Sequence, residues 1–212
     1  MLENGPFAGL EKNGYAAILA DPPWRFNTYN EKGRNRCPDW KQFKGSPSRH
    51  YETMSIDELC LLPINDISSN DCCLFLWISW PMLQEALTLI NQWGFSYKTC
   101  AFCWVKANVS QVEMFQENAK VQIGTGYWTR SNSEVVLLCT KGNPKRLHAD
   151  VRQAIVEPRR AHSRKPDCIH ERIERLVGGP YLEMFARQSM RKGWTFWGNQ
   201  TDRFNMRQPD PV

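Results

Sequence analysis

The chain has 212 residues, of which 42% are hydrophobic, and it carries a formal net charge of +5 at pH 7. This length allows one sizeable core and is too short for two full domains, so we expect a single domain over residues 1–212. The longest apolar run, residues 72–80, is about half of the roughly 20 residues that a membrane-spanning helix needs, which excludes a membrane as partner.

The first expected strand, residues 16–20, ends in the motif Asp21-Pro22-Pro23-Trp24. Ligands of open α/β sheets bind beyond the carboxyl ends of the strands, where Asp21 lies. The two prolines hold φ at about −65° and restrict the residue before each of them, so the Asp21 carboxylate and the Pro22 carbonyl take set directions.

These two acceptors and the Trp24 ring suit the amino group of an adenine. Stacking a base on an aromatic ring contributes about 1–3 kcal/mol, which largely offsets the cost of flipping that base out of a duplex. Orientation and electrostatics would then supply catalysis without a Ser, Cys or His nucleophile. The alternative is that the diproline is merely a turn and that Trp24 fills the core.

The segment after this motif is long, polar and basic. Residues 25–49 hold seven Lys or Arg and two acids. We expect residues 25–50 to form a mobile loop on the substrate side, since so long a polar segment is unusual in a compact domain. A short helix should follow at Ser55, whose spacing to Glu58 fits a capping box.

The middle of the chain predicts strands at 73–78 and 97–105, joined by a crossover helix at 81–93. Most of the eight cysteines lie in such apolar runs. This favours reduced thiols, and with an N-terminus that lacks a secretory signal it predicts a cytoplasmic protein. Cys100 and Cys103 form a C-x-x-C pair, but strand residues three apart point to opposite faces and no second pair follows, so we expect no metal.

A second long polar segment, residues 107–132, precedes the next expected strand at 134–139. Because it too is unusually long and polar, we expect it to form a second mobile loop on the substrate side. Residues 141–165 then hold eight Lys or Arg and two acids, around a strand expected at 151–156. Such stretches are usually solvated. Two of them, interleaved with Trp and His, favour a nucleic-acid partner, because Lys and Arg neutralise phosphates.

The chain ends with a helix expected at 166–177, followed by two glycines, and with strands at 181–185 and 195–197. Strand-like and helical segments thus alternate along the whole sequence. This alternation predicts an α/β fold with a mainly parallel, twisted sheet flanked by helices.

Beyond ADPPW, eight segments resemble the methyltransferase-A-seventy family of DPPW-type N6-adenine methyltransferases. They occur in the family's order between residues 16 and 202: HYETMSIDEL, CLFLWIS, FCWVKAN, GTGYWTRSNSEVVLLCTKGNP, HSRKPD, IERL, LEMFAR and WGNQTD. The resemblance implies a Rossmann-like fold that uses S-adenosylmethionine and releases S-adenosylhomocysteine. It also implies circularly permuted motifs, with DPPW first and the cofactor-binding elements last.

Carried over by position, the resemblance implies three sets of residues. The catalytic set is Asp21, Pro22, Pro23 and Trp24. The cofactor set is Asp21, Lys165 (methionyl carboxylate), Phe185, Arg187 (ribose region), Asn199 and Gln200 (adenosine end). The substrate set is Tyr51, Trp77, Trp104, Lys106, Arg130, Ser131, Glu134 and Ser163. The residues alone leave other roles open. Lys165 could be a surface cation, and Asn199 with Gln200 could form an ordinary turn. Trp77 and Trp104 could be core residues, and Glu134 could serve only to satisfy hydrogen bonds of a loop.

The function implied is methylation of adenine N6 in DNA, because the chain's size and the lack of an RNA-binding accessory domain resemble the bacterial and phage members. RNA stays open as a substrate, since fold and motifs do not separate the two. A non-catalytic nucleic-acid-binding subunit is a further alternative, although such subunits have lost the DPPW motif that this chain keeps. A zinc or redox protein built on Cys100 and Cys103 is the weakest reading. A homodimer also stays open, since no residue pattern demonstrates one.

Overall fold

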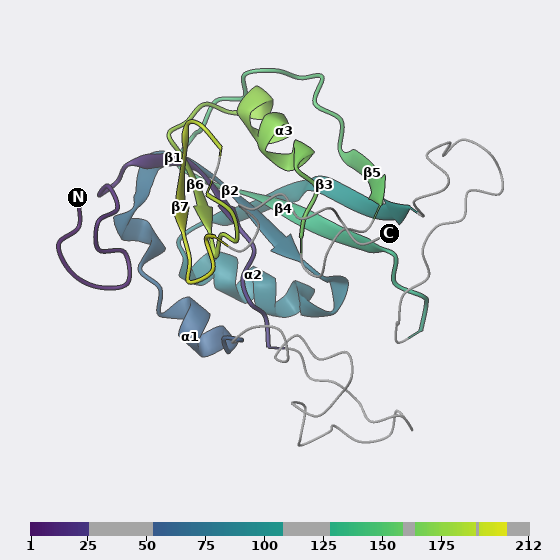
Figure 1. Ribbon diagram of the computed structural model, residues 1–212, viewed down its shortest axis with the longest axis horizontal. Helices are drawn as coiled ribbons and strands as arrows, with labels where there is room; N and C mark the ends of the chain where they lie inside the picture. Colours follow the sequence, from purple (N-terminus) through teal and green to yellow (C-terminus); the bar gives the residue numbers. More distant parts are fainter. Residues whose placement is uncertain (26–52, 108–127, 159–163, 190, 203–212) are drawn as a thin grey trace.

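The computed structural model describes residues 1–25, 53–107, 128–158, 164–189 and 191–202. Within them seven strands form one sheet in the order β5-β3-β4-β2-β1-β6-β7 (Figure 1). The strands are β1 (Tyr15–Ala20), β2 (Ser68–Ile78), β3 (Ser96–Ala107), β4 (Ser133–Lys141), β5 (Ala154–Pro158), β6 (Tyr181–Met184) and β7 (Trp194–Trp197). Each expected strand is present, with the largest differences at the starts of β2 and β5.

The seven-stranded sheet of the described residues is mixed. β1 pairs in parallel with β2 and β6, β6 with β7, and β3 with β5, whereas β4 is antiparallel to both of its neighbours, β2 and β3. Four of these six strand pairings are parallel and two are antiparallel. The reversal of β4 was not expected, because apolar spacing does not report strand direction. Since β4 alone among the described strands is reversed, its first residues lie at the edge where the other strands end.

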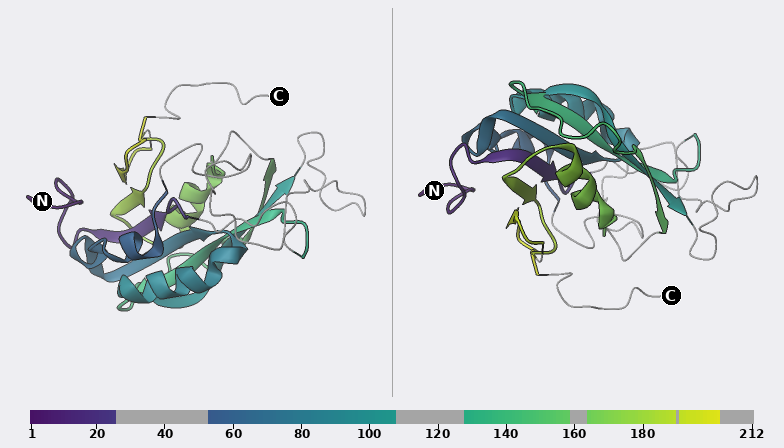
Figure 2. Two further views of the ribbon diagram at one scale, coloured as in Figure 1. Left: turned by 90° about the horizontal axis from the view of Figure 1, so that it is seen from below. Right: turned by 90° about the horizontal axis from the view of Figure 1, so that it is seen from above.

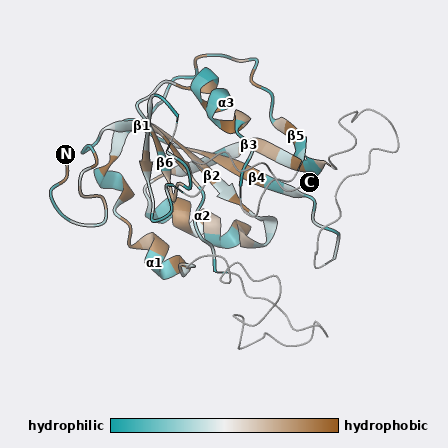
Figure 3. Cartoon of the chain, in the orientation of Figure 1, coloured by the Kyte–Doolittle hydropathy of each residue, from teal (hydrophilic) through white to brown (hydrophobic). Residues whose placement is uncertain are grey.

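Successive residues of the central strands alternate between two apolar layers. Ile18 and Ala20 of β1 pack in the layer that contains α1 (Ile56–Cys60) and α2 (Leu83–Gln92). Ala17 and Leu19 pack in the layer that contains α3 (Cys168–Leu176). Figure 2 shows α1 and α2 on one side of the sheet and α3 on the other. The central strands between them are largely hydrophobic (Figure 3).

The expected helices are confirmed, including their local signals. The Ser55 hydroxyl accepts the Glu58 backbone N–H at 3.2 Å, and the Glu58 carboxylate accepts the Ser55 N–H at 2.6 Å, which completes the capping box before α1. A short 3-10 turn, Trp80–Met82, precedes α2. Among the residues that the structure describes, no helix has the length and apolar character needed to cross a membrane.

A bulge in β3 corrects the expectation for its two cysteines. Cys100 lies opposite Leu137 and Cys103 opposite Val135, so three steps along β3 match two steps along β4. The extra residue puts both cysteines against the same layer, the one that contains α2. Burial raises the pKa of both thiols. Within the described ranges, no three His, Cys, Asp or Glu side chains gather as metal ligands would.

Candidate functional site

Four charged side chains of alternating sign meet at the edge where β1, β2 and β3 end. Lys165 Nζ lies 3.0 Å from Asp21 Oδ1 and 3.1 Å from Glu134 Oε2, and Lys106 Nζ lies 2.5 Å from Glu134 Oε1. Asp21 follows β1, Lys106 is near the end of β3, and Lys165 precedes α3. Glu134 reaches this edge because it is the second residue of the reversed strand β4.

The charges in this cluster keep Glu134 ionised and Lys165 protonated. Burial alone would raise the pKa of Glu134, but Lys165 and Lys106 outweigh it and lower the pKa to about 2. Burial alone would lower the pKa of Lys165, but Asp21 and Glu134 raise it above its ordinary value. A carboxylate with so low a pKa is a hydrogen-bond acceptor at neutral pH and a very weak base. The cluster can therefore orient a donor group, but Glu134 cannot deprotonate one efficiently.

Two buried indoles lie beneath the lysines. Lys165 Nζ is 5.2 Å from the centroid of the Trp77 ring, and Lys106 Nζ is 5.1 Å from that of Trp104. The two indoles meet edge to face, and each is only 2% exposed. Cations over indole faces are held by the ring quadrupole in addition to their ion pairs. Trp104 is thus a core residue, whereas Trp77 packs in the core and also lines the pocket described next.

A pocket opens beside Asp21 and Lys165 on the face of the sheet that α3 covers. Its lining residues come from β1 and the residue after it, β2, the segment entering α3, α3 itself, β6 and the loop after β6: Leu19, Asp21, Trp77, Arg164, Lys165, Pro166, Ile169, His170, Glu183, Phe185, Arg187 and Gln188. Four residues of the expected cofactor set are therefore together in one pocket. The other two, Asn199 and Gln200, line a neighbouring hollow formed by residues 198–202.

The loop after β6 links the pocket to that hollow. A Cβ atom at Gly198 would lie 2.8 Å from both the backbone N and O of Ala186, so the Gly198-Asn199 turn packs directly on this loop. Phe185 has a φ of 59°, which a bulky side chain rarely adopts and which costs of order 1–3 kcal/mol. Such strained residues concentrate at ligand sites. Phe185 lines the pocket in agreement with that tendency.

The DPPW corner is rigid, but its tryptophan does not face the pocket. The Trp24 ring is only 5% exposed, packs in the layer that contains α2, and donates from Nε1 to the Trp77 carbonyl at 3.1 Å. A ring so covered offers no face to a base, so the expected stacking role is corrected: Trp24 is core, as the alternative held. The Pro22 carbonyl accepts the Trp24 N–H at 2.8 Å, and the Pro23 carbonyl accepts the Met54 N–H at 2.9 Å.

The remaining candidates are placed only in part. Arg130 and Ser131 are exposed in the segment that leads into β4. Tyr51 and Ser163 lie outside the described residues, as do most of the two long loops. Of the first basic stretch the structure describes Arg25, which donates to the Thr53 carbonyl at 3.3 Å.

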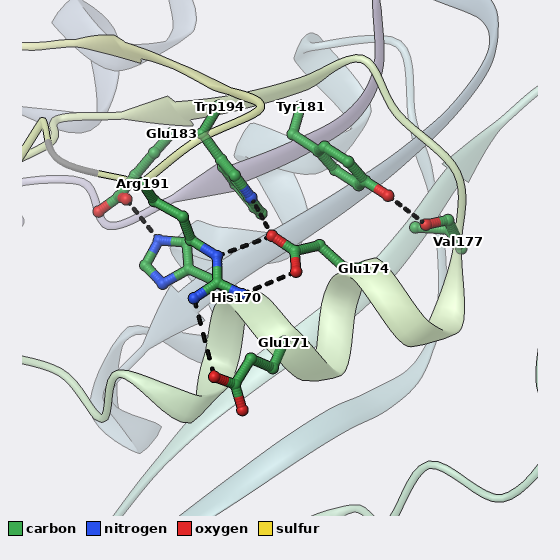
Figure 4. Close-up of polar contacts among 8 residues, drawn as sticks. All are labelled: His170, Glu171, Glu174, Val177, Tyr181, Glu183, Arg191 and Trp194. Atoms are coloured by element: carbon green, nitrogen blue, oxygen red, sulfur yellow. Dashed lines mark hydrogen bonds and ion pairs between the residues drawn. The ribbon is translucent and has the colours of Figure 1, made fainter.

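Sequence reasoning missed two pocket residues that contact each other. His170 Nε2 lies 2.7 Å from Glu183 Oε2 (Figure 4). Glu183 lies opposite Leu19 of β1, on the face that α3 covers. Strand alternation could have indicated Glu183, because its neighbours Leu182 and Met184 are apolar and are buried on the opposite face of the sheet. His170 carried no comparable signal, since it interrupts an apolar helix stripe without a motif.

Comparisons with known proteins agree with the resemblance in the motifs. The MT-A70 family model matches residues 15–200. The chain is 31% identical over 201 residues to the type II methyltransferase M.MunI of Mycoplasma sp, covering 91% of this chain and 80% of that protein. It is 29% identical over 201 residues to the N(6)-adenosine-methyltransferase catalytic subunit METTL3 of Homo sapiens, covering 93% of this chain but 30% of that protein. It is 28% identical over 191 residues to the MT-A70-like N(6)-adenosine-methyltransferase of Arabidopsis thaliana, covering 88% of this chain and 24% of that protein.

Proposed function

The chain belongs to the MT-A70 family, and from this premise we propose that it transfers a methyl group from S-adenosylmethionine to the N6 amine of adenine in DNA. The observation that carries the proposal is the position of Lys165. Its Nζ joins Asp21 of the DPPW motif to Glu134 at the rim of a pocket that also holds Arg187 and Phe185. Such an edge of an α/β sheet is where ligands bind.

The pocket residues fit the chemistry of the cofactor. S-adenosylmethionine, when bound, supplies an electrophilic methyl group, and it presents a carboxylate, an ammonium group, ribose hydroxyls and a flat base to the protein. Lys165 would hold the carboxylate, and Asp21 would accept from the ammonium group. Asn199 and Gln200 follow β7 and would hydrogen-bond the base. Because β6 lies between β1 and β7, the pocket residue Glu183 falls between these two ends, where it would accept from the ribose hydroxyls.

The substrate amine is held by acceptors on the same edge. The Asp21 carboxylate and the Pro22 carbonyl would accept its N–H groups and so orient the nitrogen lone pair. Asp21 would also stabilise the positive charge that develops on that nitrogen during transfer, and the nitrogen would then lose its extra proton to solvent. The low pKa of Glu134 supports this assignment, because the site orients the amine rather than deprotonating it before transfer.

We infer DNA rather than RNA as the substrate. The relative with 31% identity, of which the chain covers 80%, is a type II methyltransferase of Mycoplasma sp. The single sheet of the described residues supports one methyltransferase domain over residues 1–212. The position of DPPW before the loop at 185–187 and the turn at 198–200 supports the permuted motif order.

Transfer of labelled methyl from S-adenosylmethionine to sequence-matched duplex DNA, single-stranded DNA and RNA tests the proposal. We expect labelling of DNA well above that of RNA. Labelling confined to RNA would contradict the substrate, and labelling of none of the three across varied sequences would contradict the activity.

A further inference from the structure

The contact between His170 and Glu183 is shielded and lies on the wall of the pocket. The two atoms, Nε2 and Oε2, are 2.7 Å apart, and the side chains are 4% and 16% exposed. His170 stands in the first turn of α3 and Glu183 on β6. Both line the same pocket as Asp21 and Lys165. Within the described part of the chain, His170 provides the one side-chain hydrogen bond to the Glu183 carboxylate.

The imidazole is itself held in place from behind. Its ring meets Trp194 edge to face, with centroids 4.7 Å apart and planes at 85°. Trp194 Nε1 donates to Glu174 Oε1 at 2.7 Å, and Arg191 donates to both oxygens of the same carboxylate, from Nε to Oε1 and from an Nη atom to Oε2, each at 2.7 Å. Figure 4 shows Trp194, Arg191 and Glu174 beside His170. The direction of Nε2 is thus set by a network that does not itself touch Glu183.

We propose that His170 is a positioning residue for the cofactor. By donating from Nε2 to Glu183, it fixes one oxygen of that carboxylate and leaves the group aimed into the pocket, ready to accept from the ribose. The inference rests on the proposed function. A glutamate has three side-chain torsions, and ordering them before binding reduces the entropy lost when the ligand binds. His170 should therefore set cofactor affinity and leave the transfer step nearly unchanged.

A purely structural role predicts a different result. In that case His170 only ties α3 to β6, and its loss lowers stability without changing affinity. Tyr181 is a matched control, because its hydroxyl donates to the Val177 carbonyl at 3.0 Å and its ring stacks on Trp194 at 5.0 Å. It joins β6 to the C-cap residue of α3, two residues from Glu183, but it is not among the residues that line the pocket.

The test compares His170→Phe, His170→Gln and Tyr181→Phe with the wild type. Phe keeps a ring against Trp194 but has no donor, whereas Gln carries an N–H at a similar reach. The Kd for S-adenosylmethionine and for methylthioadenosine, which keeps the ribose and lacks the amino-acid end, is measured by calorimetry without nucleic acid. Thermal unfolding is followed in parallel.

We expect His170→Phe to weaken both ligands about tenfold, the size of one hydrogen bond to a charged group, and His170→Gln to restore most of the affinity. Tyr181→Phe should lower the unfolding temperature and leave both Kd values unchanged. In steady-state assays His170→Phe should raise KM for the cofactor while kcat stays within about twofold. Should the Phe variant not fold, His170→Asn replaces it, since the shorter amide cannot reach Glu183 and should lose the affinity that Gln retains.

Equal affinity of His170→Phe and the wild type overturns the inference and leaves the proposed function standing. So does an equal loss in Tyr181→Phe, because it would mark a general effect of loosening α3. A wild-type protein that binds neither ligand overturns both proposals at once.

Discussion

Lys165 Nζ lies 3.0 Å from Asp21 Oδ1, so the cation that precedes α3 is ion-paired with the acid that follows β1. The same ammonium group also contacts Glu134. One lysine therefore joins the expected cofactor side of the site to its expected substrate side. The side chains of this cluster are 20–27% exposed, which leaves them reachable by a ligand yet poorly screened by water.

Replacing Asp21 by Asn should abolish most of the methyl transfer. The amide has the shape of the carboxylate but cannot stabilise positive charge on the amine, and we expect a loss of about 100-fold or more in kcat. Cofactor binding should be retained in part, because Lys165 and Arg187 remain. Labelled transfer and calorimetry measure the two effects, with Asp57→Asn on the exposed side of α1 as a matched control. An Asp21→Asn variant with wild-type kcat would remove Asp21 from the catalytic set.

The variant Glu134→Gln should lower the free energy of unfolding by about 1–3 kcal/mol at neutral pH, since it removes the acceptor charge shared by Lys165 and Lys106. The folded-state pKa of Glu134, about 2, is below the ordinary value of 4.5. Its contribution is therefore fully present above about pH 5 and is lost as the pH falls towards 2. The difference between wild type and variant, measured by urea unfolding, should be constant between pH 6 and pH 9 and shrink below pH 4.

A difference that grew as the pH fell would contradict the depressed pKa. At the alkaline end the raised pKa of Lys165 acts in the opposite sense. Its stabilisation is present below its ordinary value of 10.5 and is lost only as the pH rises beyond that value.

Trp24→Ala should mainly lower the free energy of unfolding rather than specifically weaken nucleic-acid binding. Loss of so large a buried side chain costs about 3–5 kcal/mol, whereas Trp24→Phe should cost about 1 kcal/mol for the hydrogen bond to the Trp77 carbonyl. Denaturant unfolding of the two variants checks this order. A Trp24→Ala protein of wild-type stability that had lost oligonucleotide affinity would instead restore the stacking role.

The basic stretch at 25–49 is predicted from sequence to bind phosphates. Changing Arg34, Arg36 and Lys41 together to Ala should flatten the dependence of log Kd on log salt by about 0.9 for each phosphate of duplex DNA that the variant no longer neutralises. Lys98→Ala is the control, since this exposed lysine lies at the start of β3, at the opposite edge of the sheet from Asp21. Fluorescence anisotropy at several salt concentrations gives the slopes, and an unchanged slope in the triple variant would count against a phosphate role.

The sequence predicted the elements of this fold better than it predicted their directions. Apolar alternation located β1 to β7, but it is the same for parallel and antiparallel strands, so the reversal of β4 that delivers Glu134 could not be read from it. The bulge that turns Cys100 and Cys103 to one face was hidden for a similar reason, because an inserted residue leaves no compositional mark.

Within the site, the family motifs located four residues that line the pocket: Asp21, Lys165, Phe185 and Arg187. Trp24 was misplaced because a tryptophan beside a rigid corner suits a binding surface and a core equally well. The His170–Glu183 contact depends on how α3 packs on β6, and no local pattern encodes that packing.

Mass spectrometry of nucleosides from methylated duplex DNA tests the central claim most directly. DNA incubated with the wild-type protein and S-adenosylmethionine should yield N6-methyldeoxyadenosine, and DNA incubated with the Asp21→Asn variant should yield almost none. Methylcytosine as the product, or N6-methyldeoxyadenosine formed equally by the variant, would contradict a site in which Asp21 orients the amine of an extruded adenine.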